Sequence, residues 1–368
     1  MEAQSILQDT FFILFYGGVI MLNVVAALYL LFRRGNAIAP EVKSPIRLRR
    51  WAAAFLMGCA LSHVSWVLYL SHGNSSVVAY VIVCGLDLLM LMPTITGILL
   101  SMLQDRHRPV WPFLLMLVPA FVLISVGVIR GDTLVFLPLT FYVTFWYALL
   151  ILFIYKAVRQ YGRWLRENFA DLERKEVSQS FLILAMFLLF FLFYSITTER
   201  SMVVVYLFQA VNVVILTLLV WRVESLQELS ESTSPGAEPA GEDEKASAPA
   251  SPSIPVSIGP LLKKHCEDGQ LYLHHDLTLA QLASVIGTNR YYLSLYFAQQ
   301  GLTYNAYING LRVNHFIRSY HKAASDGRSI TAQQLASESG YHSYSTFSAA
   351  FKQHTGKAVT AWMKDVAE

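Results

Sequence analysis

Two ionisable side chains, His63 and Asp87, lie inside long apolar stretches, where they could bind a ligand or exchange a proton. An ionisable group in lipid costs roughly 2.5–3.5 kcal/mol or more unless it has a partner, so such residues are expected to serve a purpose. They could face each other across adjacent helices. A hydrogen bond that only holds two helices together would meet the same requirement, and both interpretations stay open at this point.

The other residues capable of chemistry do not form a catalytic or metal-binding set. Cys59 and Cys84 lie in apolar stretches and Cys266 lies in a polar region, so their spacing suggests neither a disulfide framework nor a zinc site. The C-terminal histidines, including His274 and His275, lack ligand spacing on a predicted helix. These residue types predict a protein that needs no cofactor and is not an enzyme.

The apolar stretches themselves predict a chain that is largely embedded in a membrane. Hydrophobic residues make up 55% of the sequence and charged residues only 14%. Seven stretches are each long enough to cross roughly 30 Å of hydrocarbon as a helix. We therefore expect an all-α protein whose residues 1–222 form a seven-helix transmembrane bundle. The predicted spans are 11–32, 51–71, 77–103, 110–129, 134–155, 180–198 and 202–221.

The basic residues predict the orientation of these spans. Arginine and lysine gather in the connections 33–50, 104–109 and 156–177, whereas the alternate connections have only Arg130 and Arg200 at their edges. Basic connections face the cytoplasm, so the N-terminus should lie outside and the C-terminal domain in the cytoplasm. This pattern predicts a multi-pass protein of the inner (plasma) membrane.

Two further segments differ from the spans. Residues 223–255 contain seven acidic residues against one lysine and are rich in Pro, Ala and Ser, which predicts a flexible acidic linker. Segment 156–176 places aromatic and aliphatic residues near helical spacing among many charges, which predicts an interfacial helix or a cytoplasmic extension of the fifth span. It could contact the C-terminal domain or could be an ordinary charged surface helix.

A helical pattern occurs twice between residues 278 and 356. In each copy a Thr-x-x-Gln capping box starts a short helix, a Leu-Ala pair provides its buried side, and a glycine ends it. A second helix with two buried residues follows, as in a helix-turn-helix unit, whose second helix enters the major groove of DNA. The first copy comprises Thr278, Gln281, Leu282, Ala283, Gly287, Leu293, Phe297 and Gly301, and the second comprises Thr331, Gln334, Leu335, Ala336, Gly340, Phe347, Phe351 and Gly356.

Over about residues 256–368 this repeat resembles the C-terminal DNA-binding domain of the AraC/XylS family of transcription regulators. The resemblance is carried by "LTLAQLASVIGTNRYYLSLYFAQQGLTYNAYINGLRVN" at 277–314 and "ITAQQLASESGYHSYSTFSAAFKQHTGK" at 330–357. It implies two helix-turn-helix units joined by a long helix at about 303–324. Both recognition helices would then enter successive major-groove faces. Val359 and Thr360 stand where the family usually has a Pro-containing turn.

The resemblance also implies which residues contact DNA. The first recognition helix would present Arg290, Tyr291 and Ser294, and the second Tyr344, Ser345, Thr346 and Ser348. Asn289, Arg290 and Lys352 are better placed to bind phosphate. Leu295 and Ala349 stand where relatives often carry long polar side chains, so fewer bidentate base contacts are expected. For the two tyrosines, base or sugar contact and partial packing on the domain surface are both open.

These features predict a membrane-bound transcription regulator that senses a membrane or small-molecule signal. Its partners would be double-stranded DNA, the lipid bilayer, an unknown signal ligand and a second copy of the chain. A transporter or membrane enzyme carrying a regulatory helix-turn-helix domain is an alternative. A protein-interaction module that has lost DNA binding is another, because residues 256–368 have only ten basic residues against seven acidic ones.

Overall fold

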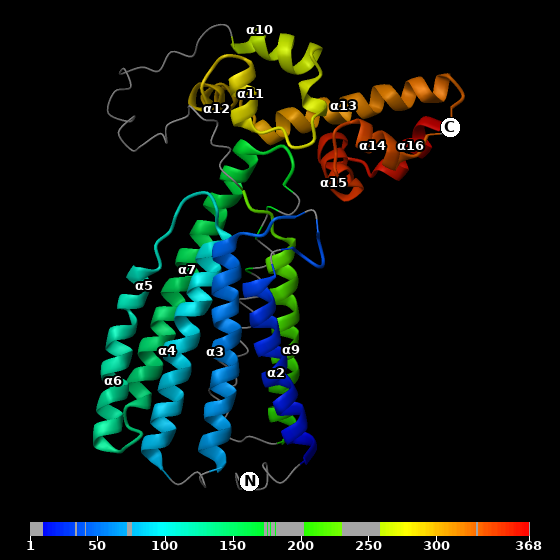
Figure 1. Cartoon of the computed structure of the whole chain (residues 1–368). Helices are drawn as coiled ribbons and strands as arrows, with labels where there is room; N and C mark the ends of the chain where they lie inside the picture. Colours follow the sequence, from blue (N-terminus) through cyan, green and yellow to red (C-terminus); the bar gives the residue numbers. More distant parts are fainter. Residues whose placement is uncertain are drawn as a thin grey trace, which may run out of the picture. The chain divides into compact units, whose positions relative to one another are not determined.

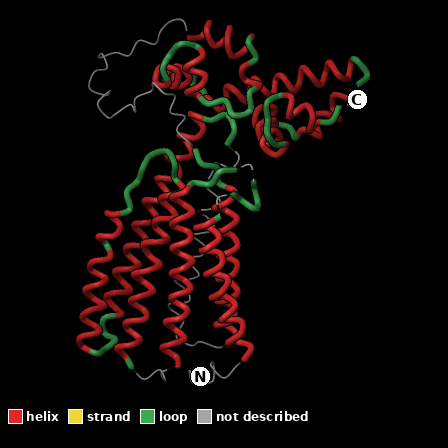
Figure 2. The backbone as a smooth tube through the Cα atoms, in the orientation of Figure 1, coloured by secondary structure: helices red, strands yellow, loops and turns green. Residues whose placement is uncertain are grey.

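Helices form the regular secondary structure of this chain, and no β-strand occurs in the part that the computed structural model describes (Figure 1, Figure 2). The described residues are 10–33, 35–40, 42–71, 76–172, 175, 177, 181, 202–229, 258–328 and 330–367. The chain divides into two compact units, one of Met1–Tyr161 with Val177–Leu229 and one of Gly162–Glu176 with Ser230–Glu368. The all-α prediction is confirmed.

The first unit contains the long apolar helices. Within the described residues, six helices are long and apolar enough to cross a membrane. The sixth predicted span, 180–198, falls outside the described residues. The helices of this unit are α2 (Thr10–Phe32), α3 (Ile46–Ser71), α4 (Val77–Met102), α5 (Trp111–Leu115), α6 (Leu117–Arg130), α7 (Phe136–Asn168) and α9 (Met202–Ser225), of which α5 and α6 form one apolar stretch.

Two of these helices differ from the predicted spans in a way that has a physical cause. The predicted span 110–129 is interrupted at Met116, between α5 and α6. Pro119 explains the break, since its ring would clash with the carbonyl four residues earlier, at Leu115, where α5 ends. Helix α7 continues past the predicted 155 to Asn168, so the structure contains the predicted helical extension of the fifth span.

Close helix packing in the first unit depends on small residues. Gly97 of α4 lies against the Trp51 ring of α3, and a Cβ atom added there would stand 2.2 Å from that ring. Helices α4, α6 and α7 share a buried cluster around Val81, Ile124 and Leu139. The outward faces carry exposed apolar side chains, such as Ile129 at 84%, as expected of helices that border lipid.

The second unit contains the duplicated pattern as two separate hydrophobic cores that share one helix. Helix α13 contributes Tyr304 and Ile308 to the first core and Val313 and Phe316 to the second. Its bounds confirm the predicted joining helix. The helices of this unit are α10 (Ile258–Leu262), η2 (Lys263–Asp268), η3 (Leu271–Leu273), α11 (Leu279–Val285), α12 (Arg290–Gln299), α13 (Tyr304–Ser325), α14 (Ala332–Glu338), α15 (Tyr344–Thr355) and α16 (Val359–Ala367).

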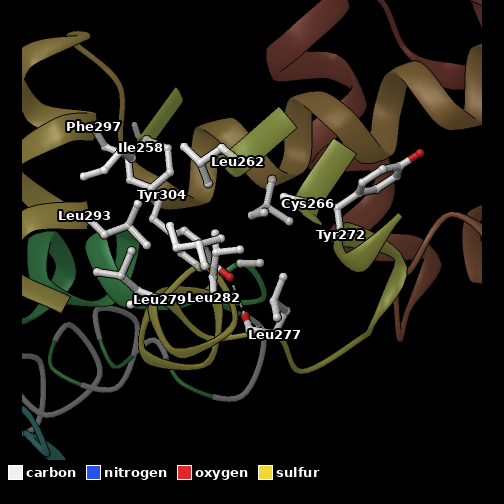
Figure 3. Close-up of a cluster of buried hydrophobic side chains, with 14 residues drawn as sticks. Ile258, Leu262, Cys266, Tyr272, Leu277, Leu279, Leu282, Leu293, Phe297 and Tyr304 are labelled. Atoms are coloured by element: carbon white, nitrogen blue, oxygen red, sulfur yellow. Dashed lines mark hydrogen bonds between the residues drawn. The ribbon is translucent and has the colours of Figure 1, made fainter. Parts of the chain in front are cut away.

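The first core explains how a short chain segment can be held firmly. Leu282 of α11 and Leu293 and Phe297 of α12 are at most 3% exposed. They gather near Tyr304, whose hydroxyl donates a 3.0 Å hydrogen bond to the Leu277 carbonyl, so even the polar tip of this ring is satisfied (Figure 3). The packing fixes α12 against α11 and α13.

Candidate nucleic-acid interface

Both helix-turn-helix units begin with the predicted capping box. The Thr278 hydroxyl accepts from the Gln281 backbone N–H at 3.2 Å, and the Gln281 side chain accepts from the Thr278 N–H at 2.8 Å. Thr331 and Gln334 repeat the arrangement at 3.2 and 3.3 Å. The reciprocal bonds satisfy N–H groups that the first turn of a helix leaves free. The start of each unit is therefore set by local sequence.

The glycines that end these first helices have unequal surroundings. Gly287 and Gly340 both have positive φ, +72° and +90°, which favours glycine. A Cβ atom at Gly287 would meet nothing within 4 Å. At Gly340 it would stand 2.9 Å from the Leu273 carbonyl oxygen and 3.0 Å from Arg312 Nε. Gly340 thus also allows a close contact between the second helix-turn-helix unit and Leu273 of the first hydrophobic core.

The first recognition helix, α12, exposes its N-terminal turn. Asn289 caps the helix, because its side-chain oxygen accepts from the Tyr292 N–H at 2.9 Å. Arg290 and Tyr291 follow and are exposed, Tyr291 by 58%. Ser294 and Leu295 are half-buried. A phosphate or a base edge could therefore reach the first turn, while Asn289 is engaged in capping.

The second recognition helix, α15, is capped by Ser343, whose hydroxyl accepts from the Thr346 N–H at 3.2 Å. The Ser343 oxygen also lies 2.9 Å from Ser345 Oγ and 3.0 Å from Thr346 Oγ1. These hydroxyls form a small polar cluster at the start of the helix. Ser343 is not among the residues that the family resemblance implies for DNA contact, although a serine just before an apolar-periodic segment is a helix-start signal.

The structure distinguishes the two predicted tyrosines. Tyr344 is half-buried, and its ring centroid lies 5.8 Å from that of Phe347 in the second core. Tyr291 is mostly exposed, and its ring contacts the neighbouring Tyr292 at 5.6 Å. Partial packing therefore describes Tyr344, whereas Tyr291 presents most of its surface to a ligand.

The remaining predicted positions of α15 give a sparsely charged face. Lys352 and Ala349 are exposed, and Ser348 is half-buried. Among the seven residues carried over for the recognition helices, Arg290 is basic and the others are Ser, Thr or Tyr. Direct reading of guanine or adenine by long bidentate side chains is correspondingly limited.

A buried arginine connects the two helix-turn-helix units. Arg312 of α13 is 0% exposed and donates from Nε to the Tyr272 carbonyl at 2.7 Å. Its Nη2 donates to the His274 and His275 carbonyls at 2.6 and 3.2 Å. The guanidinium also lies over the Tyr341 ring, 5.4 Å from its centroid.

Burial lowers the pKa of the Arg312 guanidinium, because desolvation disfavours its charged form, and the nearby Tyr341 opposes that shift. The hydrogen bonds of Arg312 go to residues that precede the first helix-turn-helix unit, and its cation–π contact is with Tyr341 of the second helix-turn-helix unit. Arg312 therefore helps to fix the spacing of the two recognition helices. The only signal in the sequence is an arginine within the stretch "YINGLRV" of the predicted joining helix.

Contacts of two histidines also connect the two helix-turn-helix units. The His275 and His342 rings stack with centroids 4.6 Å apart, and His342 Nε2 lies 3.2 Å from Asp276 Oδ2. In the part of the chain that the structure describes, no group of three or more His, Cys, Asp or Glu residues could hold a metal ion. The predicted pair His274 and His275 contributes backbone carbonyls to Arg312.

The polar residues predicted inside the apolar helices have partners other than each other. His63 of α3 contacts Gln209 Oε1 of α9 at 2.9 Å through Nε2 and the Cys59 carbonyl at 2.6 Å through Nδ1. Asp87 of α4 accepts from Trp66 Nε1 of α3 at 2.7 Å. These two bonds connect three helices. The geometry is that of interhelical hydrogen bonds, and Asn23 of α2 likewise donates to Asn212 Oδ1 of α9 at 3.3 Å.

Comparison with known proteins gives one match, and it lies in the second unit. Residues 282–365 match the model of a helix-turn-helix domain family of the AraC type. The match begins within α11 and ends within α16, so it covers both recognition helices and α13. No curated protein and no solved structure matches the chain in the same comparison.

Proposed function

We propose that this chain, whose C-terminal domain is an AraC-type helix-turn-helix domain, is a membrane-bound transcription regulator that binds promoter DNA. The observation that carries the proposal is the union, in one polypeptide, of that domain with six helices apolar enough to cross a membrane. The basic connections favour a cytoplasmic position for the domain, where it could reach DNA in a cell without a nucleus.

DNA recognition would use the first turns of both recognition helices. Arg290 and Lys352 would bind phosphates, and Tyr291 would contact a base or a sugar. Ser294, Ser345, Thr346 and Ser348 would supply shorter hydrogen bonds, with Tyr344 mainly supporting the helix. Since bidentate readers are few, selectivity would depend on both units acting together, or on two chains binding adjacent sites. Anchoring in a membrane would favour such pairing by confining the chains to a plane.

The signal would enter through the helical bundle. The predicted spans leave outer connections of only about 72–76, 130–133 and 199–201. We therefore propose that a membrane or small-molecule signal acts within the bundle or through the lipid. His63 and Asp87 are the candidate positions, because each lies in a hydrogen bond that joins two helices. A signal that changes either bond would change how those helices pack.

Selective capture of DNA by the full-length protein tests this function. The protein would be reconstituted in lipid nanodiscs and mixed with fragments of genomic DNA at several salt concentrations. We expect enrichment of a small set of fragments, with affinity that falls as salt rises because phosphate contacts release counterions. Equal recovery of all fragments at every salt concentration would instead favour a protein-interaction role for the domain.

The substitution Arg290→Ala is expected to lower the affinity for a captured fragment. Loss of one charged contact should cost about 1 kcal/mol, or about fivefold in affinity, and should make the salt dependence shallower. Arg318→Ala is the matched control, because Arg318 is an exposed arginine of α13 outside both recognition helices. Equal affinities of the two variants would remove Arg290 from the proposed interface.

A further inference from the structure

Segment Gly162–Glu176 belongs to the second compact unit, although it begins within α7. It groups with residues Ser230–Glu368, and the division falls inside α7, between Tyr161 and Gly162. Helix α7 ends at Asn168, and the residues after it take part in the fold of the C-terminal domain. The connection after α7 therefore belongs structurally to the proposed DNA-binding domain.

Backbone and side-chain bonds hold this segment on the first helix-turn-helix unit. Phe169 pairs with Thr278, the cap of α11, in an isolated antiparallel bridge. Asn305 Nδ2 of α13 donates to the Phe169 and Ala170 carbonyls at 3.2 and 2.6 Å. Asn309 Nδ2, one turn later, donates to the same Ala170 carbonyl at 3.2 Å. Two amide side chains of α13 thus bind the segment's backbone, which is a specific arrangement.

The segment also supplies part of the first hydrophobic core. Ala170 is 1% exposed and packs within that core. Asp171 is 8% exposed and acts electrostatically on both Arg312 and Tyr341. The Lys175 ammonium lies over the Phe169 ring at 5.6 Å from its centroid. Burial of an alanine leaves little room for a larger or charged side chain at this position.

We propose that segment 162–176 is a docking element that ties the first helix-turn-helix unit to α7, as a second connection besides the predicted linker, whose first residues, 223–225, are the end of α9 in the structure. The composition of residues 230–255 predicts a flexible chain, which would transmit no fixed geometry. The docked segment follows directly on α7, so a displacement of the end of that helix reaches the cap of α11. This regulatory role rests on the proposed function, whereas the docking itself does not require DNA.

Disulfide trapping in the full-length chain tests the docking. Residues paired in an antiparallel bridge have Cα atoms roughly 4.5–5.5 Å apart, within the range that a disulfide spans. The variant Phe169→Cys/Thr278→Cys, with a protease site in the linker, would be oxidised in membranes and then cut. We expect most of the C-terminal fragment to stay covalently attached on a non-reducing gel. The native Cys266 should contribute little, since it is buried and burial raises its pKa to about 12.

The duplicated pattern offers a matched control, because Thr331 caps α14 as Thr278 caps α11. Phe169→Cys/Thr331→Cys should give at least fivefold less attached fragment. Adding Ala170→Asp to the first pair should reduce its yield to the same level, whereas adding Asn314→Ala, an exposed site of α13, should leave it unchanged. Equal yields for the two cysteine pairs, or a yield that Ala170→Asp does not lower, would overturn the proposal.

DNA capture by the same membranes keeps the two proposals separate. Trapping without any selective DNA capture would support the docking and contradict the proposed function. Selective capture without trapping would contradict the docking and leave the function supported. Where both hold, reduction of the disulfide should change DNA affinity at least twofold if docking regulates the domain, and an unchanged affinity would refute that regulatory role.

Discussion

Replacing Arg312 with methionine is expected to lower the free energy of unfolding of the C-terminal domain by about 3 kcal/mol or more. Methionine keeps much of the aliphatic volume, so the change removes the contacts of the guanidinium with little loss of packing. The carbonyls of Tyr272, His274 and His275 would lose their donor, and a buried polar group without a partner costs roughly 1–3 kcal/mol. The cation–π contact with Tyr341 would also be lost.

Labelling of Cys266 can measure this loss in the full-length protein. Cys266 is 0% exposed in the first core, so a thiol reagent reaches it only when the domain opens. A loss of about 3 kcal/mol corresponds to a labelling rate on the order of 100-fold higher, since about 1.4 kcal/mol is a factor of ten. Arg318→Met is the control, because Arg318 is exposed on the same helix. Similar labelling rates for both variants would show that Arg312 does not stabilise the domain.

Gly340→Ala is expected to be much more destabilising than Gly287→Ala, although the two glycines occupy the same place in the repeat. Each substitution puts a Cβ atom on a residue with positive φ, which costs roughly 1–2 kcal/mol. At Gly340 the new atom also meets the Leu273 carbonyl carbon and oxygen at 3.1 and 2.9 Å and Arg312 Nε at 3.0 Å. The first helix-turn-helix unit would have to move away from the second, and this movement would weaken the hydrogen bonds of Arg312.

We expect a total cost of about 3 kcal/mol for Gly340→Ala and about 1 kcal/mol for Gly287→Ala, where no atom stands within 4 Å of the added Cβ. The difference should appear as a labelling rate of Cys266 that is at least tenfold higher in the Gly340 variant. Since both variants place an alanine at a positive φ, the comparison chiefly measures the collision. Equal rates would mean that the junction between the units tolerates an extra methyl group.

Features encoded by nearby residues could be predicted from the sequence. The capping boxes at Thr278 and Thr331 and the buried repeat residues follow from spacings of a few residues. The long helix α13 was implied by the family resemblance. The break at Met116 lies just before Pro119, and a proline at that place predicts a kink in its span. Local pattern was sufficient for the elements because each is stabilised first by its own sequence.

Contacts between distant residues could not be predicted in the same way. Nothing near Arg312 in the sequence identifies its carbonyl acceptors, which lie 37 to 40 residues away. The sequence of segment 156–176 was consistent with a contact to the C-terminal domain and also with an ordinary charged surface helix. The structure shows that Ala170 packs in the first hydrophobic core. The sequence predicts the same role for Tyr291 and Tyr344, and only their packing in the structure distinguishes them.

The docked segment has a consequence for how the protein is made. Asn305 binds carbonyls that lie 135 and 136 residues earlier in the chain, and α9 is synthesised between the two partners. A ribosome adding roughly 5–20 residues per second produces Asn305 on the order of 10 s after Ala170. The first core therefore cannot close during that interval. In a chain stalled before α13, the docking segment would lack its partner Asn305. The DNA-binding domain could therefore be completed only after translation has passed the last apolar helix.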